Sequence, residues 1–157
     1  MYPIEQILNE LDQKTAALWA LDCAERVLFY FNDLFPEDPR PADAIAAGLS
    51  WVRGEADADV VLKSSVAAHN AAREVVDVAF SLTGFDPLTE GVGAEAAACT
   101  AARAAGQAAA AARSAGHAPH AATYALKAVS YGEGTDEAVK KERKWQYQRL
   151  LEIAGRI

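Results

Sequence analysis

The sequence predicts an all-helical protein: a compact bundle of about six helices around a central alanine-rich helix. Thirteen of the nineteen residues from Ala94 to Ala112 are alanine, and alanine has the highest intrinsic helix propensity. Elsewhere apolar residues recur at spacings of three and four, and no segment keeps the two-residue alternation of a strand. The 157 residues suit one hydrophobic core, so we expect a single domain, 1–157.

Apolar spacing and helix-breaking residues define the expected helices. The first begins near Ile4 and ends before three closely spaced prolines, which cannot continue a helix. Pro41 suits the first turn of the second helix, and Pro119 suits that of the fifth. Asp57 or Asp59 begins the third helix, and Thr135 or Asp136 caps the last. The six helices are expected at about residues 4–32, 41–54, 57–82, 94–115, 119–131 and 135–157.

The charge is acidic and unevenly distributed. The net charge is −7, residues 137–157 carry +3, and residues 1–136 therefore carry −10. An acidic body argues against a nucleic-acid partner, which needs clustered cations, and favours a basic one. No apolar stretch is long enough to span a membrane, and the first residues lack the pattern of a signal peptide. We therefore expect a cytoplasmic protein without a membrane partner.

The sequence contains no strong catalytic or metal-binding motif. It lacks paired metal-ligand motifs, a Gly-x-Ser-x-Gly turn and a glycine-rich phosphate loop, so we expect no cofactor and no metal. A zinc site built from Cys99, His117 and His120 is a minor alternative. Cys23 and Cys99 both fall inside expected helices, which favours buried free thiols over a disulfide.

Polar residues interrupt two apolar helix stripes. His69 and Arg73 lie in the middle of a stripe spaced four and three, which consists of Leu62, Val66, His69, Arg73, Val76 and Phe80. Asp22 and Arg26 interrupt the stripe of the first helix, and Asp22 is the expected acid for Arg73. With Arg103, these four residues form either a structural network that specifies the fold or a polar pocket for a ligand.

A second candidate region is the proline-rich loop at residues 35–41. It carries Glu37, Asp38 and Arg40, and we expect these residues to form part of an interaction surface. Tyr131 is the fourth residue of a helix face that also carries His120, Tyr124 and Lys127. Tyrosine-rich faces are common at interfaces, so an exposed Tyr131 is a further candidate for the interaction surface, although a half-buried helix with its hydroxyls toward solvent is the favoured explanation of this face.

Several strings resemble a known family. They include Ala17-Leu-Trp-Ala-Leu-Asp-Cys-Ala-Glu-Arg-Val-Leu28 and Asp38-Pro-Arg-Pro-Ala-Asp-Ala-Ile45. Over residues 17–151 the chain resembles the immunity-5-like proteins of bacteria, small helical proteins inferred to neutralise toxins of polymorphic toxin systems. The resemblance implies no catalytic set, and it implies recurring polar positions at Asp22, Arg26, Arg40, His69, Arg73 and His117.

Three functional hypotheses follow. The first is a non-enzymatic immunity protein that binds and neutralises a cognate toxin, and the acidic body fits a basic toxin. The second is a small-molecule-binding protein or enzyme that uses the polar pocket of Asp22, Arg26, His69, Arg73 and Arg103. The third is an assembly module whose close-packed alanine face forms a homodimer.

Overall fold

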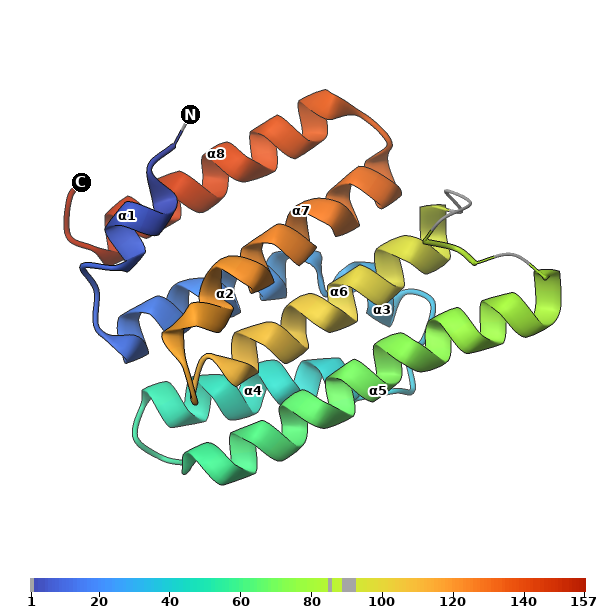
Figure 1. The fold of residues 1–157 in the computed structure, drawn as a ribbon, viewed down its shortest axis with the longest axis horizontal. Helices are drawn as coiled ribbons and strands as arrows, with labels where there is room; N and C mark the ends of the chain where they lie inside the picture. The colour runs from blue at the N-terminus through green and yellow to red at the C-terminus, as the bar shows by residue number, and fades with distance from the viewer. Residues whose placement is uncertain (1, 85, 89–92) are drawn as a thin grey trace.

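The regular structure is helical throughout the described part of the chain, which comprises residues 2–84, 86–88 and 93–157 of a computed structural model (Figure 1). The longer helices are α2 (Gln13–Val27), α4 (Arg40–Val52), α5 (Ala58–Thr83), α6 (Gly93–Ala110), α7 (Ala118–Glu133) and α8 (Asp136–Ile153). The shorter ones are α1 (Ile4–Leu8), α3 (Phe29–Asn32) and the 3₁₀ turn η1 (Ala115–His117). The predicted all-helical bundle is confirmed.

The alanine-rich helix α6 lies at the centre of the bundle. It packs most extensively against α5 and α7, which flank it in Figure 1, and also against α2, α3 and α4. From Ala96 to Ala112, every residue except Arg103 and Gln107 is buried. The small side chains allow this close approach on almost all sides. The alanine face is therefore covered by the chain's own helices and is not a dimer surface.

Helices α5 and α6 pack closely at Gly106. A Cβ atom at this position would lie 2.6 Å from Nε2 of His69, closer than side chains tolerate. The hydroxyl of Ser65, which is on α5, donates to the Gly106 carbonyl oxygen at 2.7 Å. Glycine is thus required here so that the imidazole of His69 can lie against the α6 backbone.

Large side chains fill the other side of the bundle, between α2, α7 and α8. Trp19 and Gln146 are both fully buried. The indole N–H of Trp19 donates to the Gln146 carbonyl oxygen at 2.8 Å, and the Gln146 amide donates to the Ala122 carbonyl oxygen at 3.0 Å. A buried amide must be hydrogen-bonded, and this pair of bonds fixes the register of the three helices.

The prediction of one continuous helix over residues 4–32 is wrong. The chain leaves the helical conformation after α1, and Asp12 is extended, with a ψ of 166°. Its carboxylate accepts the Thr15 backbone N–H at 2.8 Å and thereby caps a new helix, α2. A second break, at Leu28, separates α2 from α3.

The alanine helix also ends earlier than expected, at Ala110 and not near Ala115. Ser114 is extended and accepts the Gly116 N–H, which begins the η1 turn. The other boundaries agree closely with the expectations. Of the alternatives left open by the sequence, Asp57 and Thr135 are the capping residues, and each accepts a backbone N–H of its helix. None of the described helices combines the length and the apolarity that crossing a bilayer requires.

Candidate functional site

The buried face of α5 is displaced by one residue from the face that the sequence predicts to be buried. Val66 and Phe80 were expected to be buried but are 60% and 56% exposed. The buried stripe consists of Val61, Ser65, Ala68, Ala71, Ala72 and Val75. It is built of smaller residues because it faces the alanines of α6, which leave little space. His69 therefore lies at the edge of the core, half-buried, and Arg73 is exposed.

The polar network expected from the sequence is divided into two separate groups. Asp22 accepts a hydrogen bond from Arg149 at 2.8 Å, so the expected pairing of Asp22 with Arg73 is wrong. Arg26 forms two hydrogen bonds with Glu142, at 2.8 and 2.9 Å. Both partners come from α8, which covers this face of α2. The sequence shows that these groups need partners, but not which helix supplies them.

The second group lies where the surface of α6 is accessible to solvent, between α5 and α7. We call it the α5–α7 seam. It consists of His69 and Arg73 from α5, Arg103 and Gln107 from α6, His117 from η1, and Tyr124 and Lys127 from α7. Nδ1 of His117 donates to the Gln107 side-chain oxygen at 2.8 Å. Only His69, Arg73 and Arg103 were singled out together from the sequence.

Positive groups surround His69 in this seam. Its pKa is lowered from 6.5, first by burial and then by the charges of Arg103, His117 and Arg73. A lowered pKa keeps the imidazole neutral at neutral pH. Arg103 also shares an aromatic ring with a further cation, since its guanidinium lies 6.0 Å and the Lys127 ammonium 5.3 Å from the Tyr124 ring centroid.

Both cysteines are buried free thiols, as the sequence predicts. Burial raises the pKa of Cys23 well above 9.0, and burial also raises the pKa of Cys99 despite the opposing charge of Arg103. A buried thiol that stays protonated is a poor nucleophile. Among the described residues, no three histidine, cysteine or carboxylate side chains are grouped to hold a metal ion.

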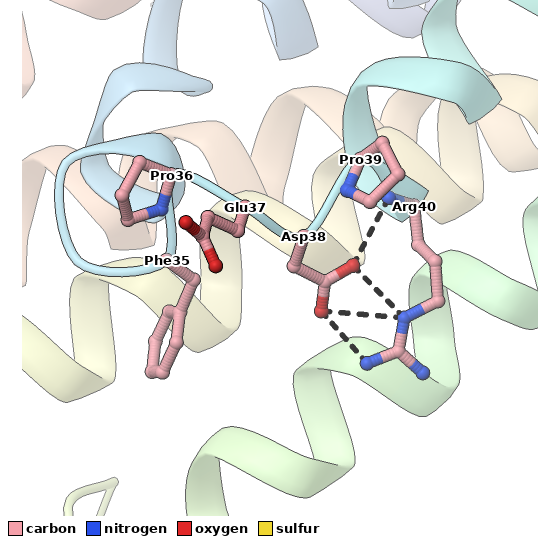
Figure 2. A pocket seen from close by; sticks show the side chains of 6 residues that line it. All are labelled: Phe35, Pro36, Glu37, Asp38, Pro39 and Arg40. Carbon is pink, nitrogen blue, oxygen red and sulfur yellow. Dashed lines mark hydrogen bonds and ion pairs between the residues drawn. The ribbon is translucent and has the colours of Figure 1, made fainter.

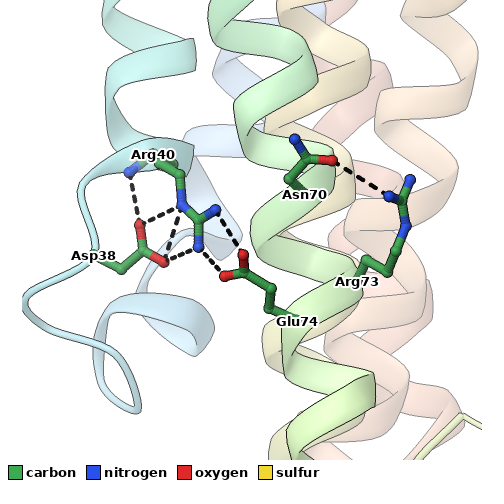
Figure 3. Close-up of polar contacts among 5 residues, drawn as sticks. All are labelled: Asp38, Arg40, Asn70, Arg73 and Glu74. Atoms are coloured by element: carbon green, nitrogen blue, oxygen red, sulfur yellow. Dashed lines mark hydrogen bonds and ion pairs between the residues drawn. The ribbon is translucent and has the colours of Figure 1, made fainter.

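The proline-rich loop is held in place by Arg40. Its guanidinium bonds to the Asp38 carboxylate at 2.7 Å and also pairs with Glu74 on α5 (Figure 3). Arg40 lowers the pKa of both carboxyl groups through these bonds. The loop from Phe35 to Arg40 borders an open hollow of about 710 Å³ (Figure 2). Glu37, on the same loop, is exposed.

Glu74 extends this region onto α5, a contribution that sequence reasoning missed. Val78 and Leu82 follow it at intervals of four, so the three residues share one helix face, and the last two are 52% and 81% exposed. Tyr131 was expected to be exposed, but it is half-buried. Its hydroxyl donates to the Leu88 carbonyl oxygen at 3.2 Å, which ties it to the segment before α6.

The search of curated proteins and the search of solved structures each found no match to this chain. One family model does match, that of the "Imm-5 like putative immunity protein", over residues 6–82 and 93–153. The matched stretches contain the proline-rich loop and every residue of the α5–α7 seam. They leave out residues 83–92. The chain therefore belongs to the Imm-5 like putative immunity protein family.

Proposed function

We propose that this protein is an immunity protein that binds a cognate protein toxin and blocks it by occlusion, without catalysing a reaction. Membership of the Imm-5 like family carries the proposal. The buried, protonated thiols support a non-enzymatic role, since they supply no activated nucleophile.

We assign toxin recognition to the loop–α5 surface, which consists of Glu37, Asp38, Arg40, Glu74, Val78 and Leu82. Arg40 fixes the carboxylates of Asp38 and Glu74 before a partner arrives. Side chains that are already ordered lose less conformational entropy on binding. The exposed Val78 and Leu82 add apolar area beside the fixed charges, and a mixture of apolar anchors and polar groups is typical of interfaces.

The charge of this surface favours a basic toxin. It contains three carboxylates and one arginine, and the whole chain carries a net charge of −7. Complementary charge increases the rate of association more than it increases affinity. A basic toxin surface would thus be drawn to the loop–α5 surface faster than a neutral one, and added salt would slow the association.

The test is protection from the toxin encoded beside this gene. Co-expression of the wild-type protein should restore growth, and the purified proteins should form a complex. Glu74→Lys places a cation beside Arg40 and should slow association by about tenfold or more, with a weaker salt dependence. Glu25→Lys is the matched control, because Glu25 is exposed on the opposite side of the bundle, on α2.

A folded His69→Gln variant tests the non-enzymatic part of the proposal. It should protect as well as the wild type, since toxin occlusion needs no acid–base group in the seam. Failure of the wild type to protect or to bind would overturn the immunity function. Full protection by Glu74→Lys, with unchanged association kinetics, would move the recognition surface elsewhere. Loss of protection by folded His69→Gln would instead favour chemistry in the seam.

A further inference from the structure

The arginines of this protein fall into two groups. Arg26, Arg40, Arg53, Arg149 and Arg156 each form an ion pair with a carboxylate. Among the described residues, no carboxylate lies within ion-pair distance of the other four arginines, which are Arg73, Arg103, Arg113 and Arg143. The chain contains 22 acidic residues and only 15 basic ones. In the described part of this acidic protein, the two arginines of the α5–α7 seam, Arg73 and Arg103, therefore have no ion-pair partner.

The positively charged side chains Arg73, Arg103 and Lys127 all belong to the α5–α7 seam. Arg103 and Gln107 are one helical turn apart and are the residues through which the central part of α6 reaches solvent. Arg103 shares the ring of Tyr124 with Lys127 from α7. Arg73 leaves α5 on the side away from Glu74 and Arg40, as Figure 3 shows, and its guanidinium donates to the Asn70 side-chain oxygen at 3.5 Å.

Two acids lie near these cations. Asp77 follows Arg73 by one turn of α5, yet no ion pair joins the two side chains. Asp86 lies near the Cys99 end of the seam, and its carboxylate accepts the Leu88 backbone N–H at 2.9 Å. Three cations that repel one another, and that form no ion pair within the described part of the chain, raise the free energy of the unliganded surface. An external anion would lower it.

We propose that the α5–α7 seam is a binding site for a small phosphate-bearing anion. Arg73, Arg103 and Lys127 supply positive charge from three different helices, and His69 lies beside the two arginines. A carboxylate offers two oxygens, whereas a phosphate group offers at least three acceptors around its centre, which suits donors that come from several elements. Gly106 allows His69 to lie directly against α6, so the imidazole is held at the edge of the site.

The bound anion would connect α5, α6 and α7, and would therefore stabilise the fold by binding the native state alone. This site lies on a different side of α5 from the loop–α5 surface, so the inference does not depend on the immunity function. Either proposal can fail while the other stands.

Titration of the full-length protein with inorganic pyrophosphate tests the site, at an ionic strength of about 0.15 M to suppress non-specific attraction. Calorimetry should give saturable binding with a Kd of about 1 mM or tighter. The melting temperature should rise with ligand concentration, and the ring resonances of His69 and His117 should shift along the same saturation curve.

Three substitutions locate the binding. Arg103→Gln and Arg73→Gln should each weaken pyrophosphate binding by about tenfold, or about 1.4 kcal/mol. Both residues are partly or fully exposed, so the variants should keep the wild-type helical content by circular dichroism. Arg53→Gln is the matched control, because Arg53 is exposed and pairs with Glu55 on a different part of the surface. Its Kd should equal that of the wild type.

Four outcomes would overturn the proposal. The first is the absence of saturable pyrophosphate binding by the wild type. The second is unchanged binding by folded Arg103→Gln and Arg73→Gln. The third is an equal loss in Arg53→Gln, which would indicate general charge screening. The fourth is citrate or a single-stranded oligonucleotide binding as tightly as pyrophosphate, since the site would then not select a small phosphate.

Discussion

The α2–α8 contact and the α5–α7 seam both contain arginines at the edge of the core, but their surroundings differ. On α2, Arg26 is joined to Glu142, and Asp22 is joined to Arg149. In the seam, Arg73 and Arg103 have no carboxylate partner among the described residues. The first region uses its charges to hold two helices together. The second keeps its charges available, which costs stability and is expected where a partner is to be bound.

Burial separates the two regions further. The Glu142 side chain is only 10% exposed, and its partner Arg26 also lies over the Trp145 ring, 4.0 Å from the ring centroid. The arginines themselves are not separated by burial, since Arg26 is 42% exposed, Arg73 is exposed and Arg103 is half-buried. The difference is the acid: a carboxylate close to the core must be neutralised by the protein, whereas a charge at the surface is solvated by water. Removing an arginine should therefore cost more stability on α2 than in the seam.

The largest effect is expected from Arg26→Ala. This change strands the Glu142 carboxylate and removes the stacking on Trp145. Breaking a fully buried pair costs about 3–5 kcal/mol, and we expect about 2–3 kcal/mol because Arg26 itself is 42% exposed. Urea unfolding measures the difference. Arg103→Ala is the control from the seam and should change the unfolding free energy by less than about 1 kcal/mol. Equal losses of unfolding free energy in both variants would contradict the distinction between the two regions.

The next effect is expected from Gly106→Ala. The added Cβ would lie 2.6 Å from Nε2 of His69 and 2.8 Å from two ring carbons, so the imidazole must move. Overpacking of this kind costs about 1–3 kcal/mol, against a gain of up to about 1 kcal/mol in helix propensity. We expect a net loss of about 1 kcal/mol in chemical denaturation.

A double mutant separates the clash from other effects of the Gly106 substitution. In the background of His69→Ala the imidazole is absent, so Gly106→Ala should become neutral or stabilising. The same loss in both backgrounds would show that His69 does not press on α6 at Gly106.

A smaller effect is expected from Asp22→Ala. Its partner Arg149 is 36% exposed and also bonds to Glu152 at 3.0 Å, so Arg149 keeps one acid when Asp22 is removed. We expect a loss of about 1 kcal/mol in the free energy of unfolding, as for other partly exposed pairs. Glu37→Ala, on the exposed loop, is the comparison and should be close to neutral. A loss of more than about 3 kcal/mol would indicate a buried pair and contradict this geometry.

Sequence patterns predicted the features of this fold that depend on neighbouring residues. The central alanine helix and the caps at Asp57 and Thr135 follow from local propensity and hydrogen bonding. The break at Asp12 carried a local signal too, a capping residue three positions before Thr15, but the apolar spacing on both sides concealed it.

Partners that are distant in the sequence could not be predicted. Arg26 and Glu142 are 116 residues apart, and Arg40 and Glu74 are 34 residues apart. The sequence identifies Arg26 and Arg40 as groups that need an acid, but only the order in which helices pack decides which acid is near. For the same reason the sequence identifies His69, Arg73 and Arg103 as polar positions, but it does not show that Arg73 and Arg103 form no ion pair within the described part of the chain.

The smallest effect concerns pH and the neutral form of His69. Its pKa is lowered in the folded protein, first by burial and then by Arg103, while the unfolded chain keeps a value of about 6.5. The unfolded state therefore binds more protons below that pH, and stability falls as the pH drops through about 6.5. The urea midpoint of the wild type should decrease from pH about 7.5 to about 5.5. His69→Gln should show a smaller decrease, and Arg103→Gln an intermediate one, because it removes one of the charges that lower the pKa. If all three proteins lose the same stability over this range, His69 is not the group that titrates, and the positive charges of the seam do not act on it.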